Sequence, residues 1–232
     1  MVKATYERGG KVLIPAFSVG RTQRLVYDLH GLWKEGQLPP LPIFVDSPLS
    51  ANVTEVFRRH PECYDQEAWN VVEGNGDPFG FSRLTYIRDV EASKALNALN
   101  VPCIIIAASG MCEAGRVLHH LKRIAPESRN TVLIVGFMAE HTLGRRIVER
   151  VPRIKLYGDE YPLRAQVESV GGLSAHADRD EMLAYFGELA QPPARTFLVH
   201  GKFDQASAFA EHLRQKGFPA VEIPERDQAF DF

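Results

Sequence analysis

The 232-residue sequence predicts an α/β fold, a Rossmann-like parallel sheet with helices on both faces. Three observations lead to this prediction. Apolar runs of strand length alternate with segments of helical spacing as far as about residue 150. The apolar runs are nearly continuous, as in strands that are buried on both faces. Glycine and proline residues mark many of the junctions between the two kinds of segment.

The first part of the chain is expected to contain five strand–helix pairs. A strand at 11–17 follows a Gly9-Gly10 turn, and the helix after it carries leucines at helical spacing. In the second helix, Val53, Val56 and Phe57 are expected to face the core. A glycine-rich stretch from 61 to 83 is expected to be a loop or lid. The expected strands are 11–17, 42–46, 84–87, 101–108 and 131–136, and the expected helices are 21–34, 47–59, 90–99, 115–124 and 143–150.

The pattern changes near residue 153. Residues 154–157 and 163–170 alternate apolar and polar side chains, as half-exposed strands do. A domain boundary is therefore expected near Tyr161. The elements expected after it are a helix at 179–189, a strand at 196–199, a helix at 205–216 and a strand at 221–223.

Composition narrows the class of protein. A hydrophobic content of 45% and a charged content of 24% are ordinary for a soluble globular protein. The formal charge of −2 argues against a protein that coats nucleic acid non-specifically. Three cysteines without motif spacing fit reduced thiols in a cytoplasmic protein, and Cys103 is expected to be a small buried hydrophobe. No apolar stretch is long enough for a membrane span, and the N-terminus has no signal-peptide pattern.

Two histidines are candidates for chemistry. His200 closes the predicted strand 196–199 and precedes Gly201; a strand-end imidazole is rigidly aimed and can bind zinc. The alternative is an ordinary histidine at a sheet edge. His176 lies in a small-residue turn, with Asp178 at the expected N-cap of the next helix, a setting that suits an acid–base imidazole beside an anion. The alternative is a capped helix with an incidental histidine.

Four turns connect the end of a predicted strand to the start of a helix, which is where α/β sheets bind ligands. Glycines, hydroxyls, helix N–H groups and arginines in these turns form plausible phosphate cradles, although glycine there often serves packing alone. Together the turns predict a polyanion-binding surface at one edge of the sheet. The candidate phosphate-binding residues are Ser18, Arg21, Ser109, Gly110, Arg116 and Arg145.

Several motifs are absent from the sequence. There is no H-x-H, no H-E-x-x-H and no paired C-x-x-C, so the chain has no self-contained zinc nest. Neither a P-loop nor G-x-G-x-x-G occurs, so nucleotide-cofactor chemistry has no support. His119 and His120 are adjacent, but helical neighbours point about 100° apart and do not share an ion. Helix-surface or core roles are therefore expected for both.

Taken together, these residues resemble the β-CASP group of metallo-β-lactamase-fold nucleases. That group includes bacterial RNA exonucleases and the endonuclease of mRNA 3′-end cleavage. The matching stretches run in the family's order, and they are residues 9–23, 108–111, 144–145, 173–178 and 198–201.

The resemblance implies an architecture and an activity. Residues 1–161 would form a β-CASP domain that lacks its N-terminal edge, and residues 162–232 the C-terminal segment of a metallo-β-lactamase αββα domain. The implied activity is zinc-dependent hydrolysis of RNA phosphodiester bonds, with two zinc ions in the cleft between the domains. His176 would donate a proton to the leaving oxygen, and His200 would bind zinc. Ser174 and Asp178 would supply supporting hydrogen bonds.

The sequence departs from the family in lacking the H-x-H-x-D-H motif and the other metal ligands. These ligands are expected to precede Met1 in a longer protein, so that this chain is N-terminally truncated and inactive alone. The implied partners are single-stranded RNA, the missing N-terminal half of the lactamase domain and, as an option, a second copy in a homodimer. No membrane contact is expected, and the expected location is cytoplasmic.

Two other functions stay open. The first is a non-catalytic RNA-binding or scaffold module of the same fold, which an intact H-x-H-x-D-H upstream would argue against. The second takes Ser109 as a nucleophile, with Asp159 or Asp178 and His200 in the order of α/β-hydrolases. Ser109 lies in A-A-S-G-M rather than G-x-S-x-G, and a serine-reactive phosphonate would test it.

Overall fold

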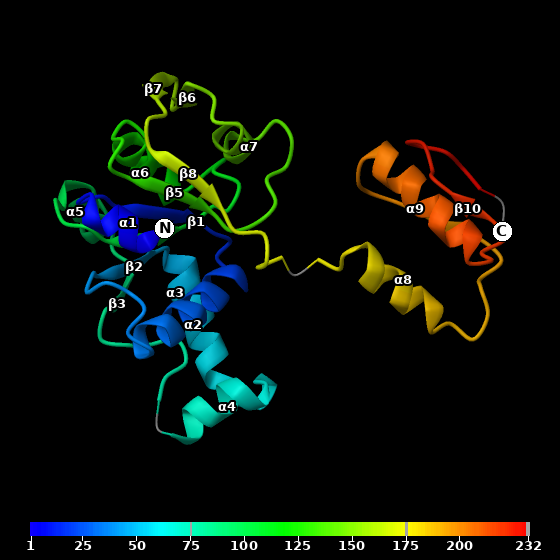
Figure 1. Cartoon of the computed structure of the whole chain (residues 1–232), viewed down its shortest axis with the longest axis horizontal. Helices are drawn as coiled ribbons and strands as arrows, with labels where there is room; N and C mark the ends of the chain where they lie inside the picture. The colour runs from blue at the N-terminus through cyan, green and yellow to red at the C-terminus, as the bar shows by residue number, and fades with distance from the viewer. Residues whose placement is uncertain (75, 175, 231–232) are drawn as a thin grey trace. The chain divides into compact units, whose positions relative to one another are not determined.

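The protein is represented by a computed structural model, in which residues 1–74, 76–174 and 176–230 are described (Figure 1). It divides into two compact units, Met1–Ser174 and Ala175–Phe232. Each unit has its own hydrophobic core.

A six-stranded sheet organises the first unit. Its strand order is β3-β2-β4-β1-β5-β8, and every neighbouring pair is parallel. The predicted fold class, a parallel sheet with flanking helices, is therefore confirmed. The strands are β1 (Val12–Pro15), β2 (Ile43–Asp46), β3 (Leu84–Ile87), β4 (Ile104–Ala107), β5 (Thr131–Ile134) and β8 (Gln166–Ser169).

Helices cover both faces of this sheet because successive strand side chains point to opposite sides. In β1, Leu13 joins the core that contains α6 and α7, whereas Ile14 joins the core that contains α2. In β4, Ile105 likewise joins the core that contains α6 and α7, and Ile106 joins the core that contains α2. The helices are α1 (Val2–Glu7), α2 (Arg21–Lys34), α3 (Pro48–Arg59), α4 (Gln66–Glu73), α5 (Val90–Ala98), α6 (Arg116–Ile124) and α7 (Leu143–Val148).

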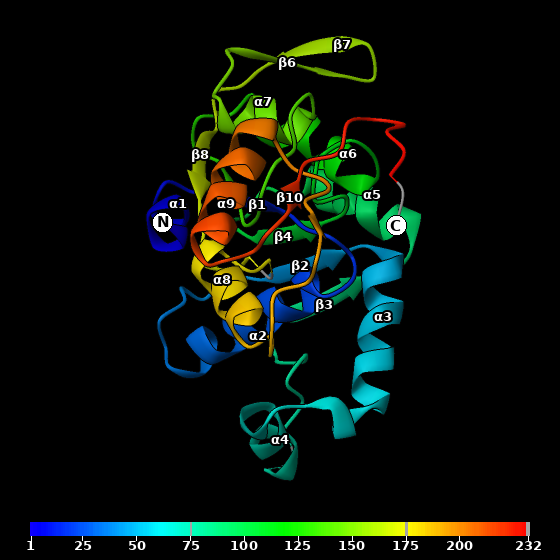
Figure 2. The ribbon, with the colours of Figure 1, turned by 90° about the vertical axis from the view of Figure 1, so that its right-hand side faces the viewer.

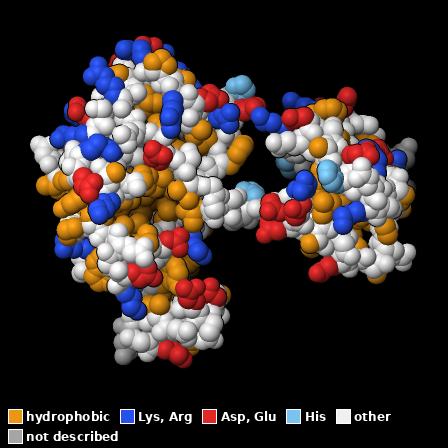
Figure 3. Space-filling view, in the orientation of Figure 1, with side chains coloured by type: hydrophobic (Ala, Val, Ile, Leu, Met, Phe, Trp, Pro, Cys, Tyr) orange, Lys and Arg blue, Asp and Glu red, His pale blue; other side chains and the backbone are white. Residues whose placement is uncertain are grey.

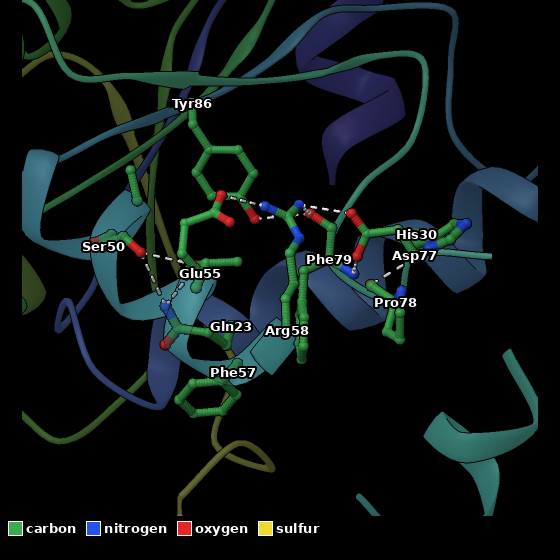
Figure 4. Close-up of polar contacts among 12 residues, drawn as sticks. Gln23, His30, Ser50, Glu55, Phe57, Arg58, Asp77, Pro78, Phe79 and Tyr86 are labelled. Carbon is green, nitrogen blue, oxygen red and sulfur yellow. Dashed lines mark hydrogen bonds and ion pairs between the residues drawn. The ribbon is translucent and has the colours of Figure 1, made fainter. Parts of the chain in front are cut away.

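The expected loop at 61–83 is partly helical, which corrects the prediction. It contains a 3₁₀ turn at Pro61–Cys63 and the helix α4, whose N-cap Asp65 accepts a hydrogen bond from the Ala68 N–H. The glycines that suggested a loop begin only where α4 ends. Figure 4 shows how the later part of this segment is fixed: Arg58 of α3 pairs with Asp77 at 2.7 Å and donates to the Phe79 carbonyl at 3.0 Å.

An antiparallel hairpin of β6 (Arg153–Leu156) and β7 (Asp159–Pro162) precedes β8. Both views place it beyond the β8 edge of the sheet, and α4 beyond the β3 edge (Figure 2). Strand β8 falls within the predicted half-exposed strand 163–170 and pairs with β5, so it belongs to the sheet of the first unit. The assignment of residues 162–232 to a lactamase-type domain stays a prediction.

The second unit is small. It contains α8 (Arg179–Gly187), β9 (Thr196–Phe197), α9 (Phe203–Gln215) and β10 (Val221–Glu222), with β9 and β10 parallel. Residues from α8, α9 and β10 form its core, among them Leu183, Leu213 and Val221. Strand β9 is shorter than the predicted 196–199, so His200 lies beyond the strand instead of closing it. Among the helices described in either unit, none has the length and apolar character of a membrane span.

Candidate functional site

The carboxyl edge of the sheet contains a topological switch point between β1 and β4. From β1 the chain crosses to β2 on one side, and from β4 it crosses to β5 on the other. Ligands of open α/β sheets bind in the crevice at such a point. The loops after these two strands touch, because a Cβ on Gly110 would lie 3.0 Å from the backbone nitrogen of Phe17.

Further contacts join four loops into one surface. Ser18 Oγ lies 3.2 Å from Ser47 Oγ, which connects the loops after β1 and β2. The Gly144 N–H donates to the Met111 carbonyl at 3.0 Å, which connects the start of α7 with the loop after β4. The structure thus brings together the turns that contain Ser18, Ser109, Gly110 and Arg145. Their phosphate-binding role stays a prediction.

Buried polar contacts hold the loop after β1 in place. The Thr22 Oγ1 hydroxyl donates to the Phe17 carbonyl at 2.7 Å. Gln23, which is 1% exposed, donates through Nε2 to the Ser18 carbonyl at 3.2 Å and to Thr54 Oγ1 at 3.0 Å. Figure 4 shows Gln23 beside Ser50 of α3. In contrast, the Arg21 guanidinium has no hydrogen bond or ion pair with the residues that the structure describes, so it is available to a ligand.

Arg116 is engaged within the protein, in a way that the sequence did not indicate. Its Nη1 lies 2.7 Å from Asp46 Oδ1, and its guanidinium also donates to the carbonyls of Ile87 and Arg88 at 3.2 and 2.8 Å. With its charge balanced by a carboxylate and its donors occupied, Arg116 is a poor candidate for binding phosphate.

Asp46 is the centre of a buried polar network at the end of β2. It is fully buried, and it accepts hydrogen bonds from His120 Nε2 and Ser93 Oγ, both at 2.6 Å, in addition to Arg116. Burial by itself would raise the pKa of this carboxyl, but the hydrogen bonds from His120, Ser93 and Arg116 outweigh it and lower the pKa. His120 is thus a core residue and His119 an exposed one, which confirms the prediction for the adjacent pair.

Other candidate side chains have local partners. Arg145 pairs with Glu149 one helical turn later at 2.7 Å and keeps 39% of its side chain exposed. The Ser109 hydroxyl accepts from the backbone N–H groups of Glu113 and Ala114 at 3.3 and 3.4 Å. It therefore organises its own loop, and its role as a nucleophile stays a prediction.

Two aromatic side chains at the same edge escaped the sequence analysis. Phe17, after β1, is 50% exposed, and Phe137, after β5, is 68% exposed. Other large hydrophobic side chains of the chain are exposed as well, among them Tyr185 and Phe203, so exposure alone does not mark a contact site. In the sequence, Phe17 is the last residue of one apolar run and Phe137 directly follows another. Figure 3 shows that charges of both signs are interspersed over the visible face of the first unit, without a broad basic area on that face.

Both candidate histidines lie in or beside turns of the second unit and are exposed. His176 precedes Asp178, which is the N-cap of α8: its carboxylate accepts from the N–H groups of Asp180 and Glu181, both at 2.9 Å. The predicted cap is confirmed. His200 has φ +68° and is followed by Gly201 at φ +91°, a left-handed pair that is costly for a non-glycine residue. Ser174 is exposed as well.

A metal centre is not complete within the described residues. No group of three or more His, Cys, Asp or Glu side chains is placed there to hold an ion. Catalytic zinc usually takes three protein ligands. His200 as a single ligand does not meet that requirement.

Comparisons with known proteins agree on one family. Residues 22–147 match the family model of the Beta-Casp domain, and residues 160–223 match that of the Zn-dependent metallo-hydrolase RNA specificity domain. Ribonuclease TTHA0252 of Thermus thermophilus is 37% identical over 94% of this chain and 49% of its own length. The RNase J-like protein of Methanocaldococcus jannaschii is 31% identical over 90% and 47%. Transcription termination factor FttA of the same organism is 31% identical over 93% and 34%. The chain thus spans between a third and a half of these relatives.

Proposed function

Because the chain belongs to the β-CASP family of metallo-β-lactamase-fold nucleases, we propose that it forms part of a zinc-dependent ribonuclease that hydrolyses RNA phosphodiester bonds. The observation that carries this proposal is the surface formed by the joined carboxyl-edge loops, where the Arg21 side chain has no partner among the described residues and Phe17, in the same β1–α2 connection, is exposed. The description of the second family model, as an RNA specificity domain, supports the same ligand.

The carboxyl edge would bind single-stranded RNA through phosphates and bases together. Arg21 and the N-terminus of α2 offer positive charge and N–H groups to phosphates. Phe17 and Phe137 offer ring faces, and base–aromatic stacking contributes about 1–3 kcal/mol per base without regard to sequence. Since few phosphates are contacted, binding should be weak and should weaken further as salt rises.

Arginine substitution tests this surface. Arg21→Ala should weaken binding of a labelled single-stranded RNA for all sequences alike and should reduce its salt dependence. Arg59→Ala is the matched control, because Arg59 is an exposed arginine at the C-terminal end of α3, whereas the N-terminal end of α3 is the one that follows β2 at the carboxyl edge. Salt-independent binding, or equal losses in the two variants, would remove the phosphate assignment.

For the chemistry, we propose that His176 protonates the leaving oxygen and that His200 contributes one ligand to a zinc centre. The remaining ligands would come from outside the described residues. In a protein with the complete centre, His176→Ala should lower turnover by about 10²–10⁴-fold and leave zinc bound. His200→Ala should lose zinc as well as activity. Full zinc in both variants would refute this division of roles.

The chain by itself should hold no stoichiometric zinc and should not cleave RNA, because the described residues place no further metal ligands beside His200. Metal analysis after dialysis checks this, and about two zinc ions per chain would contradict it. A non-catalytic RNA-binding module is the second candidate, favoured by the same incomplete ligand set. It predicts RNA binding without cleavage even when an N-terminal lactamase segment that carries an H-x-H-x-D-H motif is supplied.

A further inference from the structure

A cavity lies at the amino edge of the sheet, opposite the candidate site. Its volume is about 210 Å³, and its walls include Lys11, Asn97, Arg123, Arg129 and Asn130. Lys11 immediately precedes β1 and Asn130 immediately precedes β5, which fixes the cavity at the ends where these parallel strands begin.

The lining of this cavity carries excess positive charge. Three cations, Lys11, Arg123 and Arg129, face a single acid, Glu127. Within the described residues neither arginine has an ion pair or a side-chain hydrogen bond. Lys11 is half-buried, and burial, with a further contribution from Arg129, lowers its pKa against the opposing effect of Cys103. An anion would relieve this repulsion.

A structural explanation for these cations would be stabilisation of helix C-termini, where positive side chains are favourable. It accounts for Lys11, whose Nζ donates to the Leu96 carbonyl in the last turn of α5 at 3.2 Å. It also applies to Arg123, which lies in the last turn of α6. It does not account for Arg129, which lies beyond the end of α6 and whose side chain has no hydrogen bond or ion pair among the described residues. The Ile124 carbonyl at this helix end accepts from Asn130 Nδ2 at 3.1 Å.

The polar walls are held in place before any ligand arrives. Asn130 Oδ1 accepts from the Lys11 backbone N–H at 2.8 Å, while its Nδ2 is bound to Ile124. Asn97 Oδ1 lies 3.1 Å from Nδ1 of the buried His120. The side chain of Arg129 is free to move toward a ligand, but its backbone is fixed against Gly10, where any Cβ would lie 1.8 Å from the Arg129 carbonyl oxygen.

We propose that this cavity binds a phosphate group, either free or as the terminal phosphate of a nucleotide. The cavity is smaller than the roughly 300–1,000 Å³ of sites for drug-sized ligands, which suits a compact anion. Arg123 and Arg129 would give charge-assisted hydrogen bonds to its oxygens, and Lys11 would contribute a further N–H group. The site does not depend on the proposed ribonuclease function, because it lies at the other edge of the sheet.

Titration of the purified chain with inorganic phosphate, at constant ionic strength set with chloride, tests the proposal by calorimetry and by backbone amide NMR. Saturable binding should perturb the amides of Gly9, Lys11 and Asn130. Arg123→Ala and Arg129→Ala should each weaken binding by about tenfold, the loss of one hydrogen bond to a charged group. Both arginines are exposed, and the substitutions leave the backbone contacts intact.

One control variant and two further ligands complete the experiment. Arg59→Ala should leave phosphate binding at this cavity unchanged. If adenosine monophosphate binds at least as tightly as inorganic phosphate and adenosine does not bind, the ligand is the terminal phosphate of a nucleotide. If the nucleotide binds more weakly than inorganic phosphate, the ligand is free phosphate. The proposal fails if the Arg59 variant loses as much affinity as the cavity variants. It also fails if the NMR changes are confined to the loops of Ser18 and Ser109, or if adenosine binds at the cavity as tightly as inorganic phosphate does.

Discussion

Replacing the buried carboxylate of β2 with its neutral isostere, Asp46→Asn, should destabilise the first unit strongly. Asp46 accepts hydrogen bonds from Arg116 at 2.7 Å and from His120 and Ser93 at 2.6 Å. Asparagine keeps the shape, but its Nδ2 is a donor and would face one of these donors. Removing one partner of a buried ion pair costs about 3–5 kcal/mol, because the other charge is left uncompensated. Since the Arg116 side chain is 17% exposed, water can solvate part of it, and we expect a loss of about 3 kcal/mol.

Urea unfolding followed by tryptophan fluorescence measures this loss. Trp33 and Trp69 both belong to the first unit, so the signal reports its unfolding alone. Asp28→Asn is the matched control: Asp28 pairs with Arg24 at 3.0 Å, with 30% and 63% of the two side chains exposed. An exposed pair of this kind contributes less than about 1 kcal/mol. Equal losses in the two variants would refute the stabilising role of the Asp46 network.

The pH dependence of the unfolding free energy provides a second test of the Asp46 carboxylate. The pKa of the Asp46 carboxyl is lower in the folded chain than its value of about 3.9 in the unfolded chain. The ionised carboxylate therefore stabilises the folded state fully above the unfolded pKa, and this contribution disappears as pH falls through the folded pKa. The unfolding free energy of the wild-type chain should therefore fall more steeply below about pH 4 than that of Asp46→Asn. Parallel curves would mean that Asp46 does not carry this pH dependence.

Two further predictions concern thiols and glycines. Cys63 is exposed, whereas burial raises the pKa of Cys103 to about 11 and of Cys112 to about 12, so a disulfide reagent at pH 8 should rapidly modify one thiol per folded chain. Gly115→Ala should destabilise by more than about 1 kcal/mol, since φ is +83° and the new Cβ would lie 2.5 Å from a carbonyl oxygen. In urea melts, Gly31→Ala inside α2, where the Cβ meets no atom within 4 Å, should instead be neutral or stabilising.

Periodicity in the sequence predicted the strands and most helices, but it predicted the inward side of α3 only in part. The bounds of α2 agree with the predicted 21–34, because its apolar face packs on the sheet. Of the residues of α3 expected to face inward, Phe57 packs against the core, but Val56 is 53% exposed, and the buried residues include Ser50 and Thr54. The reason is the polar contact with Gln23, which binds the Thr54 hydroxyl and the Ser50 carbonyl. Hydrophobic spacing carries no signal for a helix contact made of polar groups.

Strand order explains why two arginines with the same sequence signal have different environments. Arg21 and Arg116 each follow a glycine and begin the helix after a buried strand. Arg116 comes after β4, whose neighbour β2 ends in Asp46, and the register sets Asp46 opposite Ala107 at the end of β4. The buried Asp46 carboxylate therefore pairs with Arg116.

Arg21 comes after β1, whose neighbours β4 and β5 end in Ala107 and Ile134, so no acid at the end of a neighbouring strand can neutralise the Arg21 guanidinium. The order of parallel strands arises from long-range packing, which is why the sequence alone gave both arginines the same role. For the same reason Arg21, not Arg116, is the residue on which the proposed RNA contact depends.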